Sequence, residues 1–176
     1  MTNLPVPVLP NEVPGNFMTS SLINTIGLNG LGFALAPPAA ILQQATAQSI
    51  STGLTLVAVT YDSESLDTYG GHSVTTNTSR YTGQVAGYYL VIASVSYATN
   101  ATGNRLIQIE KNATAVGAQV VFQSPTTSNG GTVQVAAIVQ LNGSSDYVEA
   151  YTVQTSGSTL ATTPSNTSMY VLWVHE

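Results

Sequence analysis

Residues 79–100 read SRYTGQVAGYYLVIASVSYATN, a long apolar run in the middle of the chain. Larger apolar and smaller polar side chains alternate along its second half, in the order Val91, Ile92, Ala93, Ser94, Val95, Ser96 and Tyr97. Successive residues of a strand point to opposite faces, and β-branched and aromatic residues favour sheets. The run therefore predicts a long strand that is buried on at least one face, rather than a helix or a membrane span.

Similar segments fill the chain from Ala45 onward. They are rich in Val, Ile, Thr and Tyr, they recur roughly every 10–15 residues, and Gly, Asn, Ser or Pro separates them. They read SISTGLTLVAVTY (49–61), RLIQIEK (105–111), AVGAQVVFQ (115–123), TVQVAAIVQL (132–141), YVEAYTVQ (147–154) and SMYVLWV (168–174). Many short strands with regular turn signals are typical of an all-β sandwich or barrel.

The composition excludes several partners. Only 6% of the 176 residues are charged, compared with about 25% in an average soluble domain. Three basic residues and eight acidic ones give a net charge of -5. Nucleic acids and anionic membrane surfaces are bound by clustered Lys and Arg, so we expect neither as a partner. Nine tyrosines and so few charges favour an obligate oligomer over a free monomer.

Several features that would indicate a particular class of protein are missing from the sequence. The chain has no cysteine, so it has no disulfide and no thiolate metal site. Residues 1–15, MTNLPVPVLPNEVPG, lack the basic and apolar regions of a secretory signal. No apolar run reaches the length of about 18 residues that a membrane helix needs. We therefore expect a soluble protein that is synthesised in the cytoplasm.

Residues 1–44 differ in character from the rest. Proline fixes φ and favours an extended chain, so the first residues predict an extended arm. A short helix capped by Thr19, Ser20 or Ser21 follows, then a glycine-containing apolar segment that ends at Pro37-Pro38. We expect this region to bind another subunit or another protein, through Pro5, Pro7, Pro10, Pro14, Phe17, Leu22, Ile23 and Ile26. A floppy tail is the alternative interpretation.

Residues for catalysis are scarce. His72 and His175 are the only histidines, and neither a metalloprotease motif, a nucleophile elbow nor a phosphate loop is found. We therefore expect no enzyme activity and no cofactor. Asp62, Glu64 and Asp67 make a weak candidate calcium site, because oxygen-rich loops bind this ion, although a solvated acidic loop is the simpler interpretation.

The two arginines of the predicted sandwich need partners. Arg80 and Arg105 precede strands in a chain with almost no other cations. We expect each to pair with Asp62, with Glu110 or with an acid of a neighbouring subunit.

The order of features from Val57 to Trp173 resembles the globular head of complement and the tumour necrosis factor fold, in the versions found in bacteriophage virion proteins. The first strand and its loop, a Lys111-Asn112 turn and a glycine turn at Gly143-Asp146 all take part. The residues that carry the resemblance best are Tyr81, Gly87, Tyr88, Tyr89, Tyr147 and Trp173. It implies a ten-strand jelly roll that forms a homotrimer.

The same resemblance implies a function. Residues 1–44 look like the attachment region of phage heads of this kind, with IGLNGLGFALA (26–36) in place of the usual charged helix. We expect an attachment arm with a short helix at 1–44 and a jelly-roll trimerisation head at 45–176. The implied role is a structural protein on the virion surface, a trimeric capsid decoration or head appendage that binds other virion proteins through residues 1–44. The alternative is a tail-associated, minor tail protein that recognises a host glycan.

Overall fold

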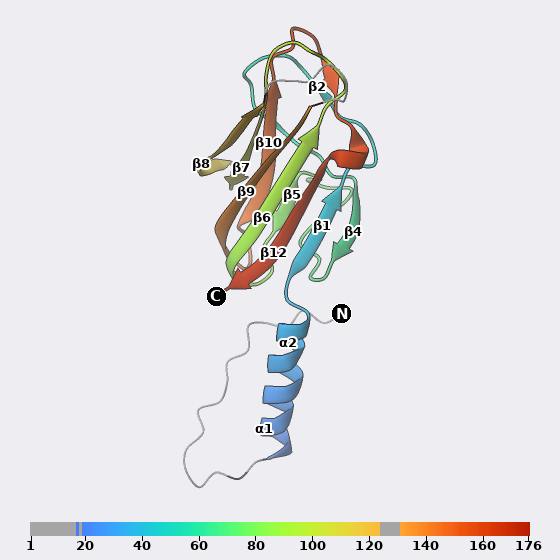
Figure 1. The fold of residues 1–176 in the computed structure, drawn as a ribbon. Coiled ribbons are helices and arrows are strands. Elements are labelled where there is room, and N and C mark those ends of the chain that lie inside the picture. The colour runs from blue at the N-terminus through green and yellow to red at the C-terminus, as the bar shows by residue number, and fades with distance from the viewer. Residues whose placement is uncertain (1–16, 18, 124–130) are drawn as a thin grey trace.

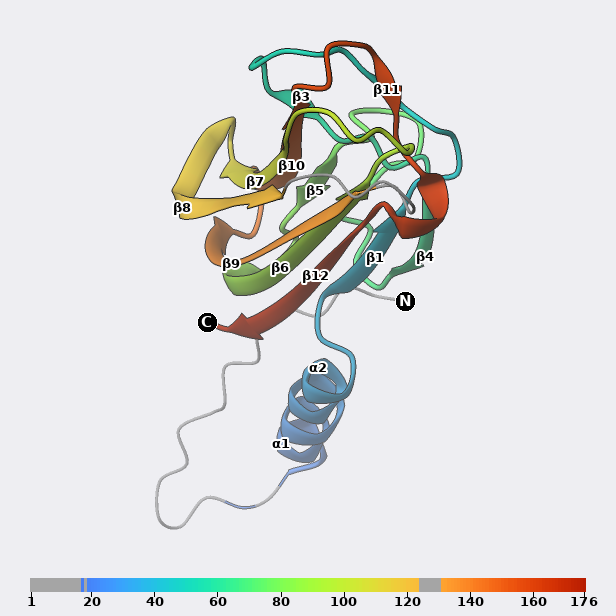
Figure 2. The same cartoon turned by 45° about the horizontal axis from the view of Figure 1, so that its top comes forward.

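The computed structural model describes residue 17, residues 19–123 and residues 131–176. Two five-stranded antiparallel sheets pack face to face as a jelly-roll sandwich (Figure 1). The first sheet has the order β4-β1-β12-β6-β9, and the second has the order β3-β10-β7-β8 with β5 also paired to β10. Figure 2 shows the two sheets as separate layers. The all-β fold and the ten strands of the two large sheets are as predicted for this described part of the chain.

The strand bounds are as follows. The first sheet contains β1 (Ala39–Gln43), β4 (Ser63–Asp67), β6 (Ala86–Ser96), β9 (Thr132–Asn142) and β12 (Ser168–His175). The second contains β3 (Val57–Ala58), β5 (Arg80–Thr82), β7 (Arg105–Lys111), β8 (Thr114–Gln123) and β10 (Tyr147–Gln154). A small third sheet pairs β2 (Ser49–Ile50) with β11 (Leu160–Ala161), and a 3-10 turn (Pro164–Asn166) precedes β12.

The core lies between the two large sheets and follows the alternation of the sequence. Along β6, the side chains of Tyr89, Val91, Ala93 and Val95 are fully buried, while the residues from Tyr88 to Ser94 that alternate with them are partly exposed. They face Ile107 and Ile109 of β7 and Val148 and Ala150 of β10 in one apolar cluster. The predicted long strand is therefore confirmed, with one face in the core.

Residues 49–61 do not form the strand that the sequence predicted for them. Only two residues of β2 and two of β3 form strands there, and Leu54 is exposed in the loop between them. Gly53 adopts a φ of 146°, which interrupts the extended backbone. Alternation alone predicted a strand, but the segment lacks a neighbour along most of its length.

One continuous helical rod precedes the sandwich. It consists of α1 (Ser20–Asn24), a π-helical stretch (Thr25–Leu31) and α2 (Gly32–Leu35). The Thr19 side chain accepts a hydrogen bond from Leu22 N at 3.2 Å, so the predicted cap is confirmed at Thr19. The glycine-containing segment was predicted to lie outside the helix, and this is wrong. Each glycine costs about 1 kcal/mol in a helix, too little to break it here.

The sheet begins earlier than the predicted boundary at residue 45. The strand β1 pairs with β12 from Ala39↔Leu172 to Gln43↔Ser168, and with β4 on its other side. Residues 39–43 thus belong to the sandwich, and the preceding region ends at Pro38. The rod projects from the end of the sandwich where β12 ends (Figure 1).

Candidate functional site

The outer face of the first sheet is apolar. Its rows follow from the strand register: Ile41 pairs with Leu66 and Tyr170, Tyr170 with Ile92, and, one row along, Leu172 with Leu90 and Leu90 with Ile138. Side chains directly opposed in an antiparallel pair lie next to each other on one face. We call this surface the apolar sheet face and define it by Ile41, Leu66, Tyr88, Leu90, Ile92, Ile138, Tyr170 and Leu172.

The apolar sheet face is open to solvent in the single chain. Ile138 is 65% exposed, and Tyr170 and Leu172 are 45% and 44% exposed. Strands β1, β6 and β9 contain no charged residue, and β12 contains only His175. Natural proteins protect exposed sheet faces and edges with charge, and large apolar patches mark interaction sites. This face has the composition of an interface core, with aromatic residues and without Lys or Glu.

The rod carries a second exposed apolar surface. Among the predicted attachment residues, Phe17 is 89% exposed, Ile23 and Ile26 are exposed, and Leu22 is half-buried. Leu28, Leu31 and Leu35 add to this surface. Pro5, Pro7, Pro10 and Pro14 lie outside the described residues. No helix in the described part of the chain is long and apolar enough to span a bilayer.

An aromatic contact fixes the base of the rod to the sandwich. Phe33 of α2 is buried, and its ring meets the Trp173 ring edge-on, with 4.9 Å between the centroids. Tyr69 and Val85 complete this small cluster. Trp173 also donates from Nε1 to the Ala86 carbonyl at 3.0 Å. Sequence reasoning missed Phe33, because it lies in an apolar segment with nothing to distinguish it from its exposed neighbours.

The residues that carry the family resemblance lie close to one another. Tyr81 and Tyr89 are buried, with ring centroids 6.1 Å apart. The Tyr89 hydroxyl donates to the Val85 carbonyl at 2.6 Å, and burial raises the pKa of this phenol to about 12. Gly87, the second residue of the long strand, has a φ of 140°. Of the aromatic pair, Tyr88 turns outward onto the apolar sheet face.

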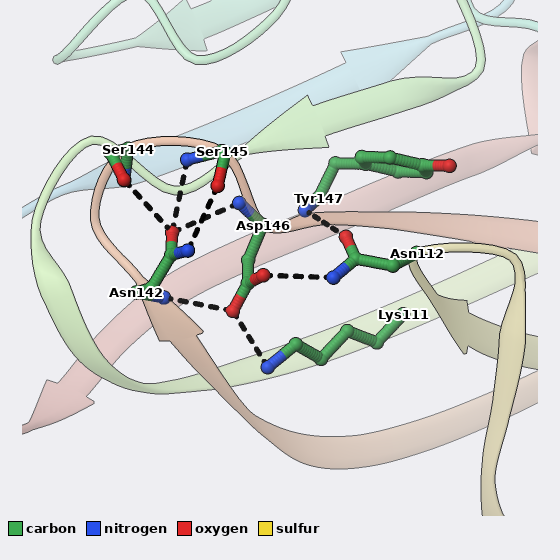
Figure 3. A network of polar contacts seen from close by, with 7 residues as sticks. All are labelled: Lys111, Asn112, Asn142, Ser144, Ser145, Asp146 and Tyr147. Atoms are coloured by element: carbon green, nitrogen blue, oxygen red, sulfur yellow. Dashed lines mark hydrogen bonds and ion pairs between the residues drawn. The ribbon is translucent and has the colours of Figure 1, made fainter.

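A polar network ties two of the turns at the rod end of the sandwich (Figure 3). The Asp146 carboxylate accepts from Lys111 Nζ at 2.7 Å, from Asn112 Nδ2 at 2.8 Å and from Asn142 N at 3.1 Å. These bonds, first the one from Lys111, hold the pKa of Asp146 below its usual value. Asn142 Oδ1 accepts from Ser144, Ser145 and Asp146 backbone nitrogens. The network fixes the two turns relative to each other.

The weak calcium candidates are not brought together. Asp62 accepts from the backbone nitrogens of Ala45 and Thr46, and hydrogen bonds from this segment lower its pKa. Asp67 accepts from the nitrogens of Gly70 and His72, and Glu64 is exposed on β4. Among the described residues, no group of three or more His, Cys, Asp or Glu side chains could hold a metal ion. The segment predicted as an acidic loop is mostly strand β4, and its Asp62 and Asp67 carboxylates accept hydrogen bonds from backbone nitrogens.

The two arginines differ from each other. Arg80 pairs with Glu149, with 3.1 Å between Nε and Oε1, so its predicted acid partners were wrong. Burial opposes the charge of Arg80 and is the largest single influence, but the hydrogen bond to Glu149 and the attraction to its charge together outweigh burial and raise the pKa of Arg80. Arg105 is buried and donates to the carbonyls of Asn100, Thr102 and Asn104. Among the described residues it has no acidic partner, and burial lowers its pKa.

Comparison with known proteins finds solved structures of similar fold. No family model and no curated protein matches the sequence. Crystal structures of murine APRIL at pH 5.0 and pH 8.0 each match with a TM-score of 0.55 and 13% identity. A third, at pH 8.5, matches with a TM-score of 0.54 and 14% identity. Each match covers 78% of this chain and 98% of the APRIL chain. The chain has the tumour-necrosis-factor-like fold.

This likeness concerns the fold alone, since the identity is far below the range in which function is shared. The tumour-necrosis-factor-like fold predicted from the sequence is thus confirmed. Function must be argued from the two apolar surfaces, the apolar sheet face and the rod.

Proposed function

We propose that this chain is a structural protein of a bacteriophage virion, a homotrimeric capsid decoration or head appendage. The heads associate through the apolar sheet face, and the region before the sandwich fastens the trimer to other virion proteins. The observation that carries the proposal is the presence of two uncovered apolar surfaces on one small chain. The resemblance of the sequence to phage virion heads supports the phage origin and the three-fold symmetry.

The apolar sheet face suits a second copy of the same chain. Strands β1, β12, β6 and β9 contain no Asp, Glu, Lys or Arg, and the acidic residues of this sheet lie on the edge strand β4, so identical copies can meet over these four strands with little repulsion. Its Tyr88 and Tyr170 have apolar rings with a polar tip, which suits surfaces that are wet before assembly and dry after it. A specific interface buries about 800 Å² on each partner, and a face that spans five strands has the breadth for it.

The rod suits a different partner. Its base packs on the head through Phe33, and the rest of it carries exposed apolar residues without any charged side chain. Helix-in-groove recognition uses such exposed apolar anchors. In this role the protein adds contacts at joints of the capsid lattice and has no need of a catalytic group.

The test is a binding experiment with phage particles that lack this protein. The full chain should co-sediment with tail-free capsids, whereas a chain without residues 1–31 should not. This truncation keeps Phe33 against Trp173 and keeps Pro37, whose carbonyl accepts from Thr68 Oγ1 at 3.1 Å. A full-length control with Ile23→Asp and Leu31→Asp separates the rod's apolar surface from chain length.

Both variants should elute as trimers. Undiminished co-sedimentation of the truncated chain would show that attachment lies elsewhere. Binding of the full chain to purified tails and not to capsids would favour the tail-associated, receptor-binding alternative.

A further inference from the structure

A polar cavity of about 430 Å³ lies beside β5. This is within the range of about 300–1,000 Å³ that small-molecule sites occupy. It is formed by the loop that follows β4, by β5, and by the start of β10 with the turn before it. The polar and aromatic side chains that line it include Ser73, Asn77, Arg80, Gln84, Ser145 and Tyr147.

The guanidinium of Arg80 is held in place at the cavity. Its carbon lies 4.0 Å from the centroid of the Tyr147 ring, and its Nε bonds the buried Glu149 carboxylate. Glu149 is itself held by Ser79 Oγ at 2.6 Å and by the Tyr151 hydroxyl at 3.2 Å. Within the described residues the two terminal nitrogens of Arg80 make no hydrogen bond, so they are available to a ligand in the cavity.

The loop wall of the cavity is also fixed. The Asp67 carboxylate accepts from Gly70 N and His72 N, both at 2.9 Å. The His72 ring lies between two backbone carbonyls, with Nδ1 2.8 Å from Arg80 O and Nε2 3.0 Å from Tyr61 O. A Cβ on Gly71 would lie 2.6 Å from the Tyr81 ring, so the loop packs tightly on the core. A wall with this support is preorganised, which reduces the entropy cost of binding.

The charge balance of the cavity favours a neutral ligand. Glu149 compensates Arg80, and Asp146 compensates Lys111 next to the turn. An anion such as phosphate would find no uncompensated positive charge. The remaining groups offer both donors and acceptors: Gln84 donates from Nε2 to Thr82 O, which leaves its carbonyl oxygen to accept, and Asn77 offers a whole amide. Hydroxyl groups, which donate and accept, match such a set.

We propose that this cavity binds a saccharide, with a neutral hexose unit as its occupant. Arg80 donates from its terminal nitrogens to ring or hydroxyl oxygens, while Asn77 and Gln84 exchange hydrogen bonds with neighbouring hydroxyls. The Tyr147 ring points away from the Asp146 network (Figure 3) and packs against the Arg80 guanidinium, which it holds in place for the sugar. The proposal concerns the single chain and does not depend on where, or whether, the trimer attaches to a particle.

The test uses saturation-transfer NMR on the full chain with glucose, galactose, mannose and N-acetylglucosamine, and with acetate and phosphate as anionic probes. Arg80→Lys keeps a positive charge near Glu149 and removes the two terminal nitrogens. Asn77→Gly removes an amide at a position whose φ of 50° glycine adopts freely. Asn104→Ala, an exposed amide at the opposite end of the sandwich, is the control.

We expect at least one of the sugars to bind, with about fivefold weaker binding in each cavity variant, since one hydrogen bond is worth about 1 kcal/mol. Asn104→Ala should leave binding unchanged, and thermal unfolding should confirm that all variants fold. Three results would overturn the proposal: no sugar binds the wild-type chain, sugar binding persists unchanged in both variants, or acetate or phosphate binds more tightly than every sugar.

Discussion

Gly87 occupies the point where the chain enters its longest central strand, beside the last residues of β12. Its φ of 140° lies in a region that residues with a side chain rarely adopt. A Cβ there would lie 2.5 Å from Trp173 Nε1 and would also collide with the His175 carbonyl. The position therefore couples the start of β6 to the tryptophan that holds the rod.

We expect Gly87→Ala to lower the free energy of unfolding by about 2–3 kcal/mol, because it adds backbone strain and a steric clash. Chemical denaturation measures this. Gly27→Ala is the matched control: it lies in the helical rod with open space around it, and it should be neutral or stabilising by up to about 1 kcal/mol. Equal effects of the two substitutions would contradict the close packing around Gly87.

Asp146 is the residue whose charge should make stability depend on pH. Its folded-state pKa lies below the unfolded value, first through the hydrogen bond from Lys111. The stabilisation is therefore present above about pH 4, the unfolded value, and is lost as the pH falls through the folded pKa.

Asp146→Asn should lower the free energy of unfolding by about 1 kcal/mol at pH 7, a modest value because the carboxylate lies near the surface. The difference from the wild-type chain should shrink as the pH falls below about 4. Urea titrations at several pH values measure it. Glu64→Gln, at an exposed position on β4, is the control and should change little; a difference that grows toward acid pH would contradict the assignment.

At the scale of elements, the rod is the part of the described chain whose stability depends most on contact with the rest of the protein. Isolated helices of this length are marginal in water, and glycines weaken them further. The contact of Phe33 with Trp173, Tyr69 and Val85 is what ties the rod to the sandwich. The rod's orientation relative to the head therefore depends on one buried side chain.

We expect Phe33→Ala to remove about 2–3 kcal/mol of local stability and to leave the sandwich folded. Thermolysin, which cuts before Leu and Ile, should then cleave within residues 20–35 at least tenfold faster than in the wild-type chain. Leu35→Ala, at a site that is 76% exposed, should have no such effect. Loss of the whole sandwich's cooperative unfolding, instead of local cleavage, would show that Phe33 supports the main core.

The individual elements also show which parts of the fold can be predicted from the sequence. The strand at 86–96 and the Thr19 cap were predictable because alternation and capping are local. The strand at 39–43 was not, since its partners lie at 63–67 and 168–175 and a short AAILQ segment after two prolines has no strong local signal. Arg80 was expected to pair, but its partner Glu149 follows from the pairing of β5 with β10, which only the fold reveals. The polar cavity could not be predicted from the sequence either, because its walls come from segments that only the fold brings together.

At the scale of the whole molecule, the composition and the surface agree. A chain with 6% charged residues leaves a broad sheet face without any protection by charge. In the proposed trimer this face becomes buried, and the solvent then meets mainly Thr, Ser, Asn and Gln. Such an interface depends on apolar burial, so salt should affect it little.

Leu172→Asp should convert the proposed trimer into monomers, because association would bury an unpaired charge at the centre of the apolar sheet face. Light scattering coupled to size-exclusion chromatography gives the mass directly, and the wild-type mass should stay the same from low to high salt. Val74→Asp, at an exposed apolar site off this face, is the control. A trimer that survives Leu172→Asp would place the interface on another surface.

The rod leaves the sandwich at the end where β12 also finishes, as the contact between Phe33 and Trp173 requires. The loop at 155–159 lies at the other end, held by the bond from Asn104 N to Thr155 Oγ1 at 2.8 Å. On a particle fastened by the rod, a peptide joined after β12 would face inward. One inserted at 155–159 would point outward, so that loop is the place to graft an epitope for display.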